Sequence, residues 1–174
     1  GNFGQFFAKK LATAFDVSVW DCRDFSDEVD KMSVKWATLK QVADKEVVVL
    51  AVPLQSMEAL FGQLALCLSP NALVMDVCSV KIEPIRLMRK YLPYSDFLGT
   101  HPLFGPQSAK DGWYGHRLVI CPVTAPSIKS ELMLQFFRDQ GLRLIELSAE
   151  EHDRQMASVQ ALTHFIARGL AGCE

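Results

Sequence analysis

Short apolar segments recur along the chain, each followed by a helical pattern, and they constrain the fold more than any other feature of the sequence. The strand candidates are 47–51, 73–77, 97–100, 118–121 and 142–147, with a short one at 17–20 and a weaker one at 34–36. The main runs are continuously apolar rather than alternating, which is typical of strands buried on both faces of a parallel sheet. The chain is therefore predicted to form a doubly wound α/β domain.

Helical patterns fill the intervals between these strands. They are predicted at 2–14, 53–68, 82–91 and 127–140, and the polar segment 26–43 is predicted as short helical pieces around the weak strand. From 149 to about 172 the pattern becomes one long helix with no strand after it. We therefore expect an α/β domain over residues 1–147. Residues 148–174 would begin an all-α second domain, most of which lies beyond this chain.

Composition excludes several classes of partner. The formal net charge is -2, and lysines and arginines are scattered singly, so no basic face for nucleic acid is predicted. The longest apolar runs, 47–54 and 64–68, are far shorter than the roughly 20 residues of a membrane helix, so no membrane span is expected. The five cysteines form no C-x-x-C pair, which predicts neither a metal site nor a disulfide framework and favours a reducing, cytoplasmic location. Because the chain begins at a glycine, a plastid location after removal of a transit segment is the alternative.

The first four residues open an amphipathic helix. Gly1, Asn2, Phe3 and Gly4 match the second half of a G-x-G-x-x-G loop, in which Gly1 would let the backbone approach a pyrophosphate and Gly4 would let helix and strand pack closely. Asp21 ends the next strand at the spacing where a carboxylate holds ribose hydroxyls. Although a glycine-rich start can lack a function, the two features together predict a Rossmann-type dinucleotide site. The first strand of that fold would lie upstream of Gly1.

Cofactor choice depends on residues near Asp21. Arg23 is of a type that meets the additional phosphate of NADP, whereas the Asp21 carboxylate would repel that phosphate, so NAD is expected and NADP is the alternative. A solvated surface charge is an equally good interpretation of Arg23. Val52 and Pro53 follow a buried strand and are expected to line the cofactor crevice, although they could also mark a plain strand end.

Two further strands end in polar side chains. Ser79 and Lys81 follow one strand and His101 ends the next, so all three are expected to face the same crevice. A neutral imidazole suits the acceptance of a proton from an alcohol during hydride transfer. A structural role for His101, and capping by Ser79 of the helix that begins near Ile82, are the competing interpretations. The Pro-Gly-Pro turn after His101 is expected to bring residues 107–113 beside the site.

The last predicted helix carries a polar stripe. Its members are Asp153, Ala157, Gln160, His164 and Arg168, which share one face. The stripe could simply meet water. A helix leaving the α/β domain would also cover the crevice, where Gln160 and His164 could contact a polar substrate.

Several of these segments together resemble a known family. The segments are "GNFGQF", "AVPL", "DVCSVK", "GTHPLFGPQSAKDGW" and "EEHDRQMASVQALTHFIARGL", in that order. They resemble the prephenate and arogenate dehydrogenases of tyrosine biosynthesis, and the likeness covers nearly the whole chain. The resemblance implies oxidative decarboxylation of prephenate to 4-hydroxyphenylpyruvate, or of arogenate to tyrosine, with hydride transfer to NAD(P).

The resemblance also implies roles for individual residues. His101 would polarise the ring hydroxyl and accept its proton, and Ser79 would contact His101 beside the nicotinamide. Gln160 and His164 would lie near the substrate. The family's C-terminal helical domain, which forms a homodimer and supplies a substrate-binding arginine, would follow Glu174. Activity is therefore expected to need a protein longer than this chain.

Two other functions are compatible with parts of the sequence. A dehydrogenase of the 3-hydroxyacid type would use a lysine on the interdomain helix as its base, whereas the equivalent stretch here offers His164 and no lysine. A non-catalytic dinucleotide-binding regulatory module is the other alternative. The joint presence of Ser79, His101 and His164 argues against it.

Overall fold

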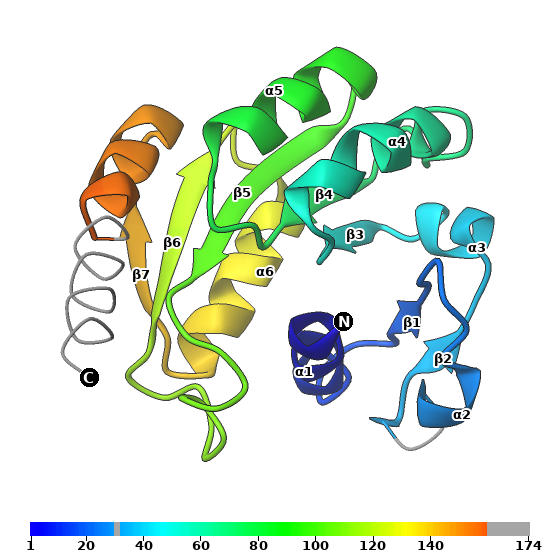
Figure 1. Cartoon of the computed structure of the whole chain (residues 1–174), viewed down its shortest axis with the longest axis horizontal. Coiled ribbons are helices and arrows are strands. Elements are labelled where there is room, and N and C mark those ends of the chain that lie inside the picture. The colour runs from blue at the N-terminus through cyan, green and yellow to red at the C-terminus, as the bar shows by residue number, and fades with distance from the viewer. Residues whose placement is uncertain (30–31, 160–174) are drawn as a thin grey trace, which may run out of the picture.

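Two sheets form the frame of the protein, and a computed structural model describes residues 1–29 and 32–159 of it (Figure 1). The larger sheet contains, in spatial order, β3 (Val47–Leu50), β4 (Leu73–Asp76), β5 (Asp96–Pro102), β6 (Arg117–Pro122) and β7 (Arg143–Glu146). The smaller sheet pairs β1 (Ser18–Val19) with β2 (Lys35–Trp36) in parallel. Every predicted strand is therefore present, with ends shifted by one or two residues.

The larger sheet is parallel except at one pair. Strands β3, β4 and β5 run in parallel, as do β6 and β7, but β5 and β6 are antiparallel. The predicted doubly wound parallel sheet is confirmed, and this one pair departs from it. The reason is the connection, because segment 103–116 contains no helix that could cross the sheet and return the chain to the same end.

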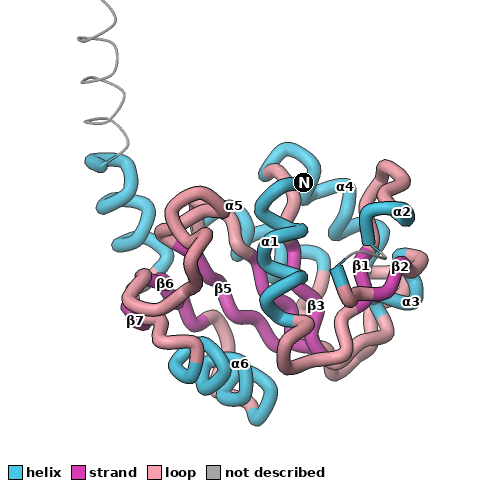
Figure 2. The backbone as a smooth tube through the Cα atoms, turned by 90° about the horizontal axis from the view of Figure 1, so that it is seen from below, coloured by secondary structure: helices cyan, strands magenta, loops and turns pink. Residues whose placement is uncertain are grey.

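Helices cover both faces of the larger sheet, as expected for a doubly wound fold (Figures 1 and 2). One face packs against α1 (Asn2–Leu11) and α6 (Ile128–Asp139), and the other packs against α4 (Leu54–Leu64) and α5 (Ile82–Tyr91). In β4, the side chains of Leu73 and Met75 pack in the core on the side of α1 and α6. The side chain of Val74, between them, packs in the core on the side of α4 and α5. Apolar side chains on both faces of one strand explain why its sequence does not alternate.

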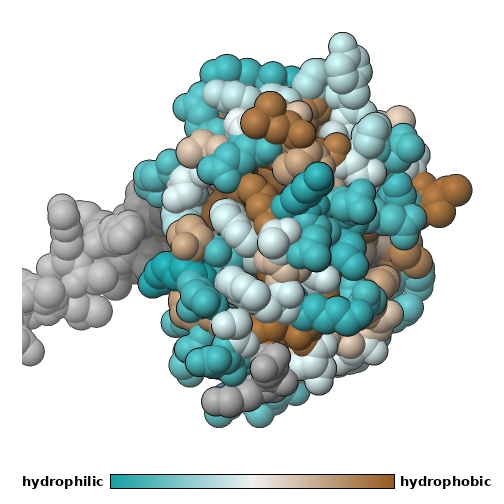
Figure 3. Space-filling view, turned by 90° about the vertical axis from the view of Figure 1, so that its right-hand side faces the viewer, coloured by the Kyte–Doolittle hydropathy of each residue, from teal (hydrophilic) through white to brown (hydrophobic). Residues whose placement is uncertain are grey.

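The two sheets are separated between β1 and β3. The orders β2–β1 and β3–β4–β5 correspond to positions 3-2 and 4-5-6 of a doubly wound sheet, whose position 1 lies between them. The strand expected upstream of Gly1 would take this position, and it stays a prediction. Two short helices, α2 (Ser26–Val29) and α3 (Leu39–Ala43), flank the smaller sheet. The molecular face that carries these elements shows hydrophilic residues interspersed with hydrophobic ones (Figure 3).

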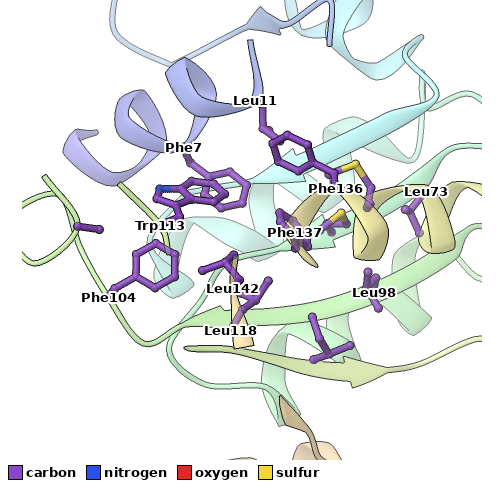
Figure 4. Close-up of a cluster of buried hydrophobic side chains, with 14 residues drawn as sticks. Phe7, Leu11, Leu73, Leu98, Phe104, Trp113, Leu118, Phe136, Phe137 and Leu142 are labelled. Carbon is purple, nitrogen blue, oxygen red and sulfur yellow. The ribbon is translucent and has the colours of Figure 1, made fainter. Parts of the chain in front are cut away.

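An aromatic cluster anchors the segment that follows β5. Trp113 stacks on Phe7 of α1 with ring centroids 5.1 Å apart, and Phe104 lies 5.6 Å from Trp113 (Figure 4). Phe137 of α6 also contacts Phe7, with ring centroids 6.1 Å apart. Segment 103–116 is thereby fixed against the helix that begins at the glycine motif.

The chain leaves the larger sheet through a helical segment. Residues 149–159 are helical up to the last described position. Among the described residues, no helix is long and apolar enough to cross a membrane.

Candidate active site

The ends of β4 and β5 bring the candidate catalytic residues to one edge of the sheet. Asp76, the last residue of β4, pairs with Gly99 of β5, and His101 lies two residues further along β5. The Thr100 hydroxyl donates a hydrogen bond to the backbone carbonyl of Asp76, with the oxygens 2.5 Å apart. His101 and the segment after Asp76 are therefore neighbours at the carboxyl edge, as predicted from the strand ends.

His101 contacts a second histidine from the last helical segment. Nδ1 of His101 lies 2.8 Å from Nε2 of His152, and Nδ1 of His152 lies 2.7 Å from Oδ1 of Asp153. His152 is fully buried, whereas His101 is half-buried. Two imidazoles and a carboxylate thus form a continuous hydrogen-bonded row.

Asp153 also joins this row to the start of α5. Its Oδ1 accepts a hydrogen bond of 2.7 Å from the backbone N–H of Lys81, and its Oδ2 accepts one of 2.9 Å from that of Ile82. Burial alone would raise the pKa of Asp153, but the hydrogen bonds from Ile82, His152 and Lys81 outweigh it and lower that pKa. The carboxylate is therefore ionised at neutral pH, and the positive end of α5 favours this charge.

The side chain of Lys81 turns inward. Its ammonium group pairs with Asp76 and donates a 2.7 Å hydrogen bond to the Thr100 carbonyl, and both charged side chains are fully buried. The prediction that Lys81 faces the crevice is wrong, because a buried carboxylate at a strand end needs a buried partner. Burial raises the pKa of Asp76 above its ordinary value in spite of the nearby ammonium.

His101 is neutral over the physiological pH range. Burial above all, together with the Lys81 ammonium, lowers its pKa from 6.5 to about 4, against the opposing effect of Asp153. A neutral imidazole can accept a hydrogen bond and then a proton from a substrate hydroxyl. The position and the protonation state both suit a proton acceptor.

Ser79 does not make either of its expected contacts. Its side chain is exposed and, among the described residues, makes no hydrogen bond, so the contact with His101 is not formed in this structure. Capping of α5 by Ser79 is not observed either, because Asp153 accepts from the first N–H groups of that helix. Ser79 still follows β4 at the same edge as His101.

The glycine motif forms the start of α1. Gly1 is the N-cap residue, and a Cβ atom placed on it would meet no other atom within 4 Å. A Cβ on Gly4 would lie 3.3 Å from the Cβ of Ala51, just beyond β3, so glycine permits the close approach of helix and strand end. Asn2 and Phe3 form the first turn, in which Phe3 stacks on Phe7.

Asp21 lies beside this helix start. Its Oδ2 is 3.3 Å from the Gly1 nitrogen, and its Oδ1 accepts a 3.0 Å hydrogen bond from the Arg23 backbone N–H. Burial would raise the pKa of Asp21, but the hydrogen bonds that it accepts from Arg23 and its neighbours lower that pKa. An open backbone at Gly1, the N-terminus of α1 and an ionised carboxylate together fit the pyrophosphate and ribose of a dinucleotide.

The other cofactor candidates lie around this region. Arg23 is exposed, with its guanidinium over the ring of Phe25, 5.0 Å from the centroid. Val52 packs against the core beneath α4 and α5, and Pro53 is the exposed N-cap residue of α4. Among residues 1–29 and 32–159, no group of three or more metal-ligating side chains is present.

The structure also adds residues to the site and leaves some predictions outside it. Gln160 and His164 lie outside the described residues. His152 was not predicted, and Asp153 was assigned only to a polar helix face. The adjacent histidine and aspartate at the start of the last helix were the only sequence signal for this part of the site. Their partners are distant in the sequence, because His152 contacts a residue 51 positions earlier and Asp153 contacts one 72 positions earlier.

Fold and site define a nucleotide-binding α/β domain with an imidazole at the carboxyl edge of its sheet. The family model described as the prephenate dehydrogenase nucleotide-binding domain matches residues 16–146. The chain belongs to this family.

Curated relatives are of two kinds. The chain is 33% identical to the chloroplastic arogenate dehydrogenase 1 of Arabidopsis thaliana over 97% of its own length and 28% of that protein. Arogenate dehydrogenase 2 of the same plant is 33% identical, over 98% of this chain and 51% of that protein. The T-protein of Haemophilus influenzae is 30% identical, over 98% of this chain and 42% of that protein. The chain thus spans about half or less of each of these relatives.

Solved structures share the fold. Prephenate dehydrogenase from Aquifex aeolicus superposes with a TM-score of 0.81 at 23% identity, covering 98% of this chain and 67% of that one. Its complex with hydroxyphenyl propionate and NAD+ gives a TM-score of 0.80 at 24% identity, covering 98% and 65%.

Proposed function

We propose that this chain is the nucleotide-binding and proton-accepting part of a dehydrogenase that oxidatively decarboxylates prephenate or arogenate in tyrosine biosynthesis. The observation that carries the proposal is the neutral imidazole of His101 at the carboxyl edge of the sheet. Membership of the family and the names of the relatives support the same reaction. A 3-hydroxyacid-type mechanism lacks its basic side chain here, because residues 148–174 contain no lysine.

The cofactor proposed is NAD. Gly1 and Gly4 would admit the pyrophosphate, and Asp21 would hold the ribose hydroxyls. The lowered pKa of Asp21 keeps its negative charge, which disfavours the additional phosphate of NADP. The NAD+ in the complex of the Aquifex aeolicus structure supports this choice, and NADP remains the alternative because Arg23 is exposed nearby.

His101 handles the only proton that moves. When bound, NAD would supply the acceptor for the hydride of the ring carbon that bears the hydroxyl, so that the ring carboxylate could leave as carbon dioxide and the ring could become aromatic. His101 takes the hydroxyl proton as the carbon–oxygen bond gains double-bond character, and returns it to the phenolic oxygen. No net proton is released, and the chain's main tasks are alignment and this temporary storage of one proton.

The finer assignments belong to the same proposal. Ser79 would approach the nicotinamide and the substrate from the end of β4, and Gln160 and His164 would contact the substrate. Residues 1–147 would form the nucleotide-binding domain, and residues 148–174 would begin a helical domain through which the protein forms a homodimer. The cytoplasm is the proposed location, with the plastid as the alternative suggested by the chloroplastic relatives.

One assay tests the reaction. The protein expressed from its complete reading frame is mixed with prephenate or arogenate and with NAD or NADP, and the absorbance of reduced nicotinamide is followed. We expect turnover with NAD and at least one of the two substrates. Absence of turnover in all four mixtures, with a folded protein that binds NAD, would instead favour a regulatory dinucleotide-binding module.

A further inference from the structure

The row formed by His101, His152 and Asp153 has a defined hydrogen-bonding direction. Asp153 is ionised and can only accept hydrogen bonds, so the 2.7 Å contact requires a proton on Nδ1 of His152. A neutral His152 then offers a lone pair at Nε2. The 2.8 Å contact with His101 therefore requires that His101 carry its proton on Nδ1.

His152 lies in an enclosed part of the site that also holds charged side chains. Its side chain is fully buried, and the charged groups around the row are the Lys81 ammonium, the Asp76 carboxylate paired with it, and Asp153. With His152 neutral, the free lone pair of His101 is on Nε2, which makes no hydrogen bond to any described residue.

We propose that His152 and Asp153 are positioning residues that hold His101 as its Nδ1–H tautomer, with Nε2 as the atom that accepts the substrate proton. The inference rests on the proposed function for the identity of that proton. Within the described part of the chain, the ring nitrogens of His152 contact only His101 and Asp153, so its part in the reaction is exerted through His101.

The row also stabilises the charge that the reaction creates. When His101 gains a proton at Nε2, its Nδ1–H still donates to His152, and the Asp153 carboxylate lies beyond that second ring. The N–H groups of Lys81 and Ile82 fix the carboxylate, so neither ring needs to turn during proton transfer. Loss of His152 would leave His101 free to adopt the Nε2–H tautomer, in which Nε2 cannot accept a proton.

The tautomer can be measured without turnover. Nitrogen NMR of the complete protein, labelled with ¹⁵N-histidine, distinguishes protonated from unprotonated ring nitrogens, and His101→Asn identifies the His101 signals by their loss. At pH 7 we expect Nδ1 of His101 to be protonated and Nε2 to be unprotonated. A His101 ring protonated at Nε2 alone, or a positively charged His152, would overturn the proposal.

Variants separate positioning from folding. His152→Phe keeps a ring of similar shape but removes both nitrogens, and we expect kcat to fall about 10- to 100-fold with KM for substrate within about threefold. Arg154→Gln is the matched control, because Arg154 lies in the same helical segment, is exposed and, among residues 1–29 and 32–159, forms an ion pair with Glu151 alone. The control should keep wild-type kcat. Equal effects of both variants on kcat, or an unchanged kcat in a folded His152→Phe protein, would contradict the role of His152.

The two proposals fail in different ways. If the assay of the preceding subsection shows no turnover while the NMR signals match the expected tautomer, the reaction is wrong but the hydrogen-bonded row stands. If turnover is observed with the opposite tautomer, the reaction stands and the assignment of Nε2 is wrong.

Discussion

The Lys81 ammonium and the Asp76 carboxylate form an ion pair that is completely enclosed at the end of β4. Lys81 also donates to the carbonyl of Thr100, the residue before His101, so the pair ties the end of β4 to that of β5. The same ammonium helps to lower the pKa of His101. Lys81, which was expected to face the crevice, thus acts on His101 through its buried charge instead.

Removal of this lysine should destabilise the domain. Lys81→Met leaves Asp76 buried without its partner, and we expect the free energy of unfolding to fall by about 3–5 kcal/mol in urea titrations. The double variant Asp76→Leu, Lys81→Met should recover most of this loss, because it removes both charges. Lys90→Met breaks an exposed pair with Glu58 and should leave the urea midpoint unchanged. A single Lys81→Met variant as stable as the control would show that the pair is not needed for folding.

His101→Asn should remove proton acceptance while it preserves the fold. We expect kcat of the complete protein to fall about 10²- to 10⁴-fold, with the Kd for NAD within about twofold. His116→Asn is a suitable control, since His116 ends segment 103–116, which follows β5, and packs on Phe104. Comparable turnover of His101→Asn and wild type would remove His101 from the mechanism.

The low pKa of His101 makes stability depend on pH. Between pH 6.5 and about 4 the unfolded chain protonates this ring and the folded chain does not, so the contribution of His101 to stability falls as pH drops through this range. Unfolding free energies of wild type and His101→Asn, measured from pH 7 to pH 4, isolate this contribution from those of the carboxylates. We expect the wild type to lose stability more steeply. Parallel curves would mean that the ring has an ordinary pKa in the folded state.

Gly4→Ala tests the approach of α1 to the sheet. The added Cβ would come within 3.3 Å of the Ala51 Cβ, which forces the helix start away from β3, and we expect the Kd for NAD to rise about tenfold. In Gly62→Ala, by contrast, the new Cβ meets no atom within 4 Å in α4, so NAD binding should not change. Calorimetric titration of both variants gives the comparison. Identical affinities would contradict a role for the Gly4 contact in cofactor binding.

Asp21→Ser tests cofactor choice. Loss of the carboxylate removes the ribose contact and the repulsion of a phosphate, so kcat/KM should fall for NAD and rise for NADP. Asp24→Ser is a matched control, because Asp24 caps a nearby turn through the Ser26 N–H and is exposed. If the ratio of the two kcat/KM values shifts equally in both variants, Asp21 does not select the cofactor.

Most strands of the fold could be predicted from local apolar patterns in the sequence. Runs such as 73–77 are apolar on both faces, and that is enough to predict a buried strand and its order in the chain. The antiparallel direction of β6 depends instead on how segment 103–116 packs on α1, which the apolar pattern does not contain. Continuous apolar strands therefore predict burial but not direction.

The site was predicted where it depends on strand ends and missed where it depends on distant contacts. His101 and Asp76 are neighbours because parallel strands end at one edge, which the strand pattern predicts. The inward turn of Lys81 depends on the enclosed Asp76 carboxylate. The contact between His101 and His152 depends on the path of the chain after β7, 51 residues later in the sequence.

The two carboxylate oxygens of Asp153 link two helical segments. They hold the helical segment 149–159 to the N-terminus of α5, and the residue before Asp153 supplies the ring that contacts His101. A rotation of this helix about its own axis would withdraw both residues together. The hydrogen bond that His101 makes at Nδ1 thus depends on how segment 149–159 is rotated against α5.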